Sequence, residues 1–214
     1  MNLFAFATGA LRRGSALLLS LLALLAFVPA AARAADEVEH VVLYEEDPAN
    51  PAGLRFPGSV AWHTEKVTSA GQPDELALRA DVDIPGNFKL KLVFRRNYDN
   101  GLPASHTVEL TFTPVPGYHG LNISNVPGML MKTNEAARGT PFAGLAIKVI
   151  NNVFMVGFSD VAADRQRNLQ LLRERSWFDI PLVDARQRRL IVAIEKGTSG
   201  ERALTTALTA WGQN

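Results

Sequence analysis

Two neighbouring segments in the middle of the chain alternate between apolar and polar residues. In segment 76–84 the even positions are apolar, and in segment 88–96 the even positions from 88 to 94 are apolar as well. Side chains of a β-strand point alternately to its two faces, so each segment predicts a strand with one buried face. Between them lies Pro85-Gly86-Asn87, which has the composition of a turn. We therefore expect an antiparallel hairpin that packs one face against the rest of the protein.

The charged residues of these segments indicate how the hairpin pairs. When the strands are joined by this turn, Asp83 lies opposite Lys89 and Asp81 lies opposite Lys91. Opposite charges that face each other across two strands contribute roughly 0.2–1 kcal/mol each. A shift by one residue would also turn the apolar face toward water, so only this register satisfies both patterns.

Most of the chain after residue 35 also has strand patterns. Further strands are predicted at 40–46, 59–67, 106–113, 145–150, 153–158, 177–183 and 188–195. One helix is predicted to begin near Ser159 and Asp160, and another after a cap at Thr198 or Ser199, because such side chains accept hydrogen bonds from a first helical turn. We expect a mainly β protein with two helices in its C-terminal third, arranged as an antiparallel β-sandwich or a curved sheet.

The C-terminal third contains a predicted tight turn and a predicted amphipathic helix. The pair Asn151-Asn152 separates two apolar runs and favours a tight turn, in which Val149 faces Phe154. The last helix carries an apolar stripe that is expected to lie on the sheet, formed by Ala203, Leu204, Ala207, Leu208 and Trp211.

The N-terminal segment 1–34 has the composition of a signal peptide. Two arginines precede an apolar run at 16–28, and Ala32-Arg33-Ala34 fits the small-x-small rule for cleavage. We expect cleavage after Ala34 and export to the periplasm, which leaves residues 35–214 as a single β-rich domain. The alternative is an uncleaved segment that anchors the protein in the inner membrane, because the apolar region is just long enough to span a bilayer.

Charge and cysteine content exclude several classes of protein. The chain has 22 basic and 21 acidic residues, and loss of segment 1–34 removes three arginines and no acid. The mature domain then has 19 basic and 21 acidic residues, which argues against nucleic acid as a partner and against an anionic membrane surface. The lack of cysteine excludes disulfides, thiolate zinc sites and cysteine nucleophiles. We expect no stable membrane span after cleavage.

The sequence offers few candidates for catalysis. The turn Gly157-Phe158-Ser159-Asp160 lacks the second glycine of a nucleophile elbow, so Ser159 is interpreted as a helix cap. The histidines show no spacing that is typical of metal ligands. Ser105 and His106 are adjacent, but neighbouring strand residues face opposite ways, which argues against a hydrogen bond between them. We therefore expect no catalytic residue, no cofactor and no metal.

Several segments resemble a group of uncharacterised exported proteins of α-proteobacteria. These are VLYEEDP at 42–48, NGLPASHTVELTF at 100–112, SNVPGMLMK at 124–132, DRQRNLQLLRERSWFDIPLV at 164–183 and IEKG at 194–197. The C-terminal sequence IEKGTSGERA is also similar to the invasion-associated locus B family of small exported β-sandwich proteins, in which a strand pair leads into an alanine-rich helix that begins with glycine. The cysteines of that family are absent here. Both resemblances imply an exported β-rich protein, and neither supplies catalytic residues.

Segment 115–140 is the longest stretch without a regular pattern, and it is rich in glycine. A long loop on a rigid scaffold is a usual place for recognition. We hypothesise that a surface for a partner or ligand is formed by Tyr118, His119, Asn122, Asn125 and Met129. Met129 and Met131 are expected to be exposed near turns. The alternative is a loop that folds back and buries its methionine and leucine side chains as an extra edge of the core.

These observations favour a non-enzymatic periplasmic protein that binds an unknown envelope protein or a small ligand. One alternative is a hydrolase with a site near His106 and the 115–140 loop, and another is a carrier of an apolar ligand. A large closed cavity would favour the carrier, and convergent His, Ser and acidic side chains would favour the enzyme. A filled core with an exposed apolar patch would favour the binding protein.

Overall fold

The computed structural model describes residues 39–68, 74–117 and 122–213, which belong to a compact unit of residues 35–214. The described residues form twelve strands and two helices: β1 Glu39–Asp47, β2 Asn50–Val67, β3 Glu75–Ile84, β4 Phe88–Arg96, β5 Ala104–Pro114, β6 Ile123–Asn125, β7 Leu130–Lys132, β8 Thr140–Pro141, β9 Gly144–Ile150, β10 Val153–Ser159, α1 Ala162–Glu174, β11 Trp177–Asp184, β12 Arg189–Glu195 and α2 Gly197–Ala210.

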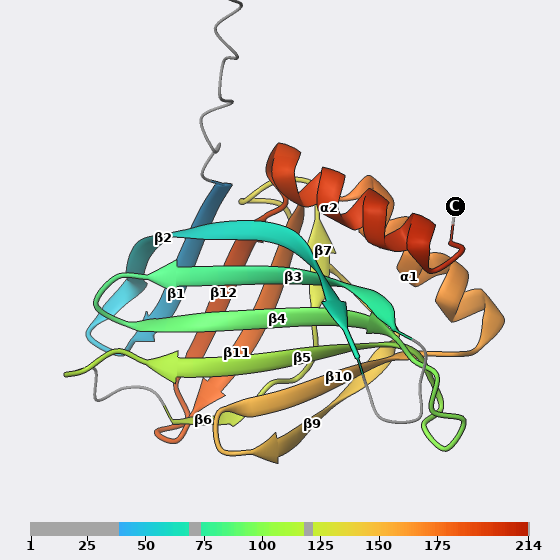
Figure 1. The fold of residues 1–214 in the computed structure, drawn as a ribbon. Coiled ribbons are helices and arrows are strands. Elements are labelled where there is room, and N and C mark those ends of the chain that lie inside the picture. The colour runs from blue at the N-terminus through green and yellow to red at the C-terminus, as the bar shows by residue number, and fades with distance from the viewer. Residues whose placement is uncertain (1–38, 69–73, 118–121, 214) are drawn as a thin grey trace, which may run out of the picture. The chain divides into compact units, whose positions relative to one another are not determined.

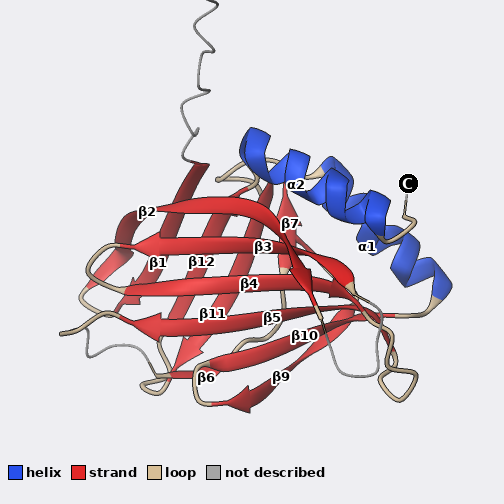
Figure 2. Cartoon of the chain, viewed as in Figure 1, coloured by secondary structure: helices blue, strands red, loops and turns tan. Residues whose placement is uncertain are grey.

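All of these strands belong to a single antiparallel sheet that curls into a half-barrel (Figure 1). Its order is β8-β7-β11-β12-β1-β2-β3-β4-β5-β10-β9, and β6 pairs with β11 beside this path. The two helices lie next to each other on one side of the curl (Figure 2). The prediction of a mainly β fold with two helices in the C-terminal third is confirmed, and of the two predicted arrangements the curved sheet is the one observed.

The register predicted for the central hairpin is confirmed. In the β3–β4 pair, Asp83 lies opposite Lys89 and Asp81 lies opposite Lys91. The Lys89 ammonium lies 3.3 Å from the Asp83 carboxylate. Asp81 forms its ion pair with Arg79 at 2.8 Å, because that guanidinium lies two residues away on the same face of β3.

The β9–β10 hairpin differs from its predicted register by one residue. Asn152 adopts a φ of 60°, as the tight turn requires. Beyond the turn, however, Phe154 pairs with Lys148 and not with Val149, because a β-bulge interrupts the ladder next to Val153. The bulge inserts Val149 as an extra residue and bends this strand at the rim of the sheet.

The inside of the curl is filled by aromatic side chains from strands that lie far apart in the sheet order. The rings of Trp62 on β2 and Phe94 on β4 lie 5.6 Å from that of Phe178 on β11. Helix α2 covers this cluster with the predicted apolar stripe, whose five residues are all buried. A Cβ at Gly200 would lie 3.0 Å from the Trp62 ring, so glycine allows the helix to approach this closely.

Both helices begin differently from the prediction. Helix α1 begins at Ala162, and Ser159 Oγ accepts a hydrogen bond from the Val161 N–H at 3.3 Å before the first turn. For α2, neither Thr198 nor Ser199 supplies a side-chain cap. The Glu39 carboxylate on β1 accepts the Ser199 N–H at 2.9 Å. A carboxylate suits this position because the amino end of a helix carries a partial positive charge.

The two ends of the sheet path, β8 and β9, are consecutive in the chain and are joined by Phe142 and Ala143. Helix α1 holds this connection, since the buried Asn168 amide accepts the Ala143 N–H at 2.9 Å and donates to the Ala143 carbonyl at 2.8 Å. The Phe142 ring stacks on Phe158 with 4.4 Å between centroids. The region between β8 and β9, around Phe142 and Ala143, is called the seam below.

Candidate functional site

The described part of segment 115–140 is built into the sheet. Asn125 pairs with Val183 through β6, and Met131 pairs with Phe178 through β7. Met129 and Met131 are only 2% and 0% exposed. The expectation that these methionines are exposed is therefore wrong, because pairing with β11 turns them into the core. The alternative, in which the loop buries such side chains as an extra edge of the core, is confirmed for the two methionines, whereas Leu130 is half-buried.

The five residues of the hypothesised contact surface do not share one environment. Asn122 and Asn125 are exposed, and the Asn122 carbonyl accepts the Ala185 N–H at 2.8 Å. Met129 is buried and so cannot contribute to a surface in this conformation. Tyr118 and His119 lie outside the described residues, so their part in recognition stays a prediction.

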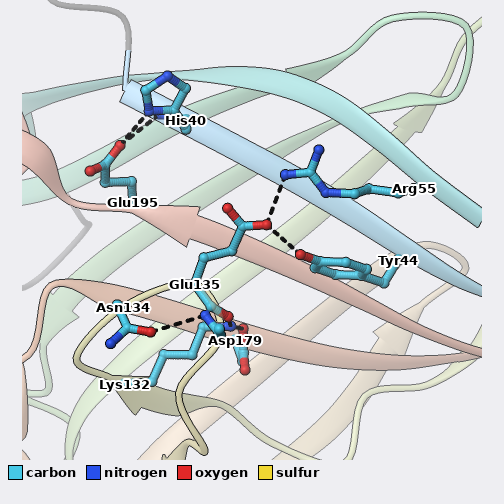
Figure 3. A network of polar contacts seen from close by, with 9 residues as sticks. His40, Tyr44, Arg55, Lys132, Asn134, Glu135, Asp179 and Glu195 are labelled. Atoms are coloured by element: carbon cyan, nitrogen blue, oxygen red, sulfur yellow. Dashed lines mark hydrogen bonds and ion pairs between the residues drawn. The ribbon is translucent and has the colours of Figure 1, made fainter.

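Residues 133–139 follow β7 and are called the strap below; Figure 3 shows the Glu135 side chain of this strap reaching toward Tyr44 and Arg55. The Glu135 carboxylate accepts hydrogen bonds from the Tyr44 hydroxyl on β1 and from the Arg55 guanidinium on β2, the latter at 2.8 Å. Both bonds lower the pKa of Glu135, with that from Tyr44 contributing most. This network ties the strap to the sheet and leaves each of its charged groups with a partner.

A buried ion pair lies under the strap. The Lys132 ammonium lies 2.6 Å from the Asp179 carboxylate and donates to the Glu135 carbonyl at 2.6 Å. The Lys132 and Asp179 side chains are 4% and 14% exposed. Burial raises the pKa of Asp179, and the hydrogen bond from Lys132 acts in the opposite direction. The two charges contact each other and the strap backbone, which is typical of a structural element.

His106 is buried near the start of β5. Its Nδ1 lies 3.1 Å from Ser105 Oγ, so the expectation that these neighbours cannot bond is wrong. The short serine side chain stays close to the backbone, where its hydroxyl also donates to the Phe158 carbonyl at 3.3 Å. Burial lowers the pKa of His106 to about 4, and the charges of Arg96 and Arg165 contribute less. The imidazole is therefore neutral at pH 7.

The hydrolase alternative requires His106 to lie near the 115–140 loop. In the structure, the residues around His106 belong to a different part of the sheet from the described strands of that loop. Its ring packs 5.2 Å from Trp211, which follows α2. It pairs with Arg96 on β4 and Phe158 on β10. Residues 123–125 and 130–132 pair with β11, which is separated from β5 by five strands in the sheet order. The described geometry thus gives His106 neighbours that are mainly aromatic and cationic.

Strand β9 exposes an apolar row at the end of the sheet. Leu145 is 80% exposed and Ile147 is 56% exposed, although both lie within a strand. Figure 1 shows β9 as the outermost strand, and within the described residues its ladder partner is β10 alone. Its charged residue, Lys148, points the other way and donates to the Ile123 carbonyl at 3.1 Å. The outward row is therefore uncharged.

A groove of about 380 Å³ lies along the outer face of β9 and β10. Leu145, Ile147, Met155 and Gly157 are among the residues that line it. Ser159 and Asp164 form its polar end. An apolar groove beside an edge strand offers both main-chain hydrogen bonds and side-chain contacts to an extended segment. This edge and its groove are the candidate site.

The sequence contains little that would reveal this site. The segment Gly144–Ile150 is apolar at both strand parities, a pattern that is typical of a strand buried on both faces. Which strand ends a sheet depends on pairings between distant residues, and no local pattern encodes them. Lys148 is the one weak signal, because lysine is common on edge strands.

Comparison with protein-family models, with curated proteins and with solved structures gives no match. No helix among the described residues is long and apolar enough to cross a membrane. Nor do the residues described in the structure bring three or more His, Asp or Glu side chains together as ligands for a metal ion.

Proposed function

We propose that this protein is a non-enzymatic binding protein of the cell envelope, and that it binds an extended apolar segment of another polypeptide along β9. The observation that carries this proposal is the exposure of Leu145 and Ile147 on an edge strand. An edge strand presents backbone N–H and C=O groups that an added strand can pair with. The filled aromatic interior supports a binding protein more than a carrier.

The charge of β9 also supports this proposal. Edge strands commonly carry outward charges that prevent pairing with other chains. In β9, the Lys148 ammonium lies on the inner face, 5.8 Å from the centre of the Phe154 ring. The outward row of β9 therefore carries no charge that would repel a partner strand, and the charged residue that lines the groove is Asp164 at its polar end.

We predict that Ile147→Lys weakens binding of an extended apolar peptide by about tenfold or more, because it removes an apolar contact and places an ammonium on the edge. The probe is a fluorescent peptide of about ten residues with alternating valine and serine, titrated by fluorescence polarisation. Ile147 is 56% exposed, so the variant should keep its stability.

The matched control is Ile191→Lys, which introduces the same charge on the central strand β12, where the side chain is 39% exposed. It should bind the peptide like the unchanged protein. Equal peptide affinities for the two lysine variants would contradict the proposed site.

The envelope location rests on segment 1–34. We predict that the protein recovered from the periplasm has lost these residues, since the apolar run and Ala32-Arg33-Ala34 favour cleavage after Ala34. Intact-mass spectrometry of the exported protein measures this directly. A mass that retains the segment would support the inner-membrane anchor instead.

A further inference from the structure

A second, smaller cavity lies in the seam, on the opposite face of β9 from the groove. Its volume is about 190 Å³. Apolar residues and glycine form all of its walls, among them Pro127, Pro141, Pro181, Gly144 and Val156. Cavities for drug-sized ligands begin at roughly 300 Å³, so this one has room for little more than a side chain.

The cavity lies where a strand that pairs with β9 could place a side chain. Gly144 begins β9, and Val156 lies on the neighbouring strand with its side chain in the core. Leu145 and Ile147 line the groove on the other face. Because neighbouring side chains of a strand point to opposite faces, an added strand would direct alternate residues to the groove and to the seam.

We propose that the seam cavity is a specificity pocket for one apolar side chain of the strand that pairs with β9. This inference rests on the proposed function. It assigns the ligand a chemical pattern: apolar residues toward the groove, and one leucine-sized or phenylalanine-sized residue toward the seam. The three prolines lack backbone N–H groups, so these positions of the wall offer no hydrogen-bond donor to a polar side chain.

The charge of Lys148 argues against a second copy of this chain as the strand that pairs with β9, and favours a different polypeptide. In an antiparallel pair of two β9 strands, the inner-face residues Ala146 and Lys148 of the second copy would point to the seam. Lysine would then meet a cavity whose walls carry no carboxylate. Burial of an unpaired ammonium is strongly unfavourable. An apolar side chain from a different strand meets no such cost.

The pocket is tested with three peptides that share alternating valine and serine and differ at one central serine position, which becomes leucine, glycine or lysine. We expect the leucine peptide to bind about tenfold more tightly than the glycine peptide, because leucine transfers its side chain from water into the cavity. The lysine peptide should bind more weakly than the glycine peptide. Equal affinities for leucine and glycine would overturn the pocket and leave the β9 site in place.

A filling variant provides the second measurement. Leu130→Phe enlarges a half-buried side chain on the wall of the cavity. In this variant the leucine and glycine peptides should bind with about equal affinity, and the affinity for the glycine peptide should stay the same as in the unchanged protein. The comparison of peptides on the unchanged protein decides the question even if this variant folds poorly. A retained leucine preference in a folded Leu130→Phe protein would overturn the pocket.

Two further outcomes separate the causes of failure. If none of the three peptides binds, the proposed function itself fails. If sedimentation shows a dimer that Ile147→Lys dissociates, the occupant of β9 is a second copy, and the pocket assignment is overturned.

Discussion

Replacing Asp179 by alanine is expected to lower the free energy of unfolding by about 3–5 kcal/mol. The Lys132 side chain is 4% exposed, and without the Asp179 carboxylate its ammonium keeps the hydrogen bond to the Glu135 carbonyl but has lost its counter-charge. Loss of one partner costs more than the ion pair contributes, because the other charge stays buried without compensation. Urea unfolding followed by tryptophan fluorescence measures the difference.

The control removes both charges. A double variant, Lys132→Met with Asp179→Leu, should recover most of the lost stability, since apolar residues of similar volume replace a buried pair at little cost. The two substitutions should therefore be strongly non-additive. If the double variant is as unstable as the sum of the single variants, the buried pair is not the cause.

Acidification from pH 7 to pH 4 is expected to remove about 3 kcal/mol of stability through His106 alone. The pKa of this buried imidazole is about 4 in the folded protein, whereas an unfolded chain has a histidine pKa of about 6.5. Between these values the unfolded chain binds a proton and the folded protein does not. The contribution is thus fully present above about pH 6.5 and is lost as the pH falls toward 4.

Carboxylates also titrate in this range, so the measurement compares variants. His106→Phe keeps a ring against Trp211 but cannot titrate, and its unfolding free energy should fall less steeply with decreasing pH. His63→Gln removes an imidazole that is 45% exposed, which controls for the loss of a histidine as such. Parallel pH profiles for the unchanged protein and His106→Phe would contradict this prediction.

The parts of the fold that could be predicted from the sequence are those in which local patterns agree. In the 76–96 hairpin the alternation, the turn and the charges of Asp83 and Lys89 all indicate one register, which the structure has. In the β9–β10 hairpin the turn was predicted correctly, but the predicted register was wrong by one residue. The bulge at Val149 is invisible in a segment that is apolar at both parities.

The remaining errors come from partners that are distant in the sequence. The Glu39 carboxylate on β1 takes the place of the expected serine or threonine cap of α2. Met131 is buried because it pairs with Phe178 of β11. Neither partner can be inferred from neighbouring residues. The β9 site was missed for the same reason, since the exposure of Leu145 depends on which strand ends the sheet.

The neighbours of β1 have a consequence for the order of folding. Val41 pairs with Gly58 in β2 but also with Ile194 in β12, so the first described strand depends on the last one. Closing so large a loop costs entropy before any contact is gained, which slows the step. The meander from β2 to β5 can form early, whereas the apolar β1 gains its second neighbour only when the polypeptide has been made as far as β12. We expect a slow final phase of refolding in which β1 and β12 dock, and until then β1 has only one of its two neighbours.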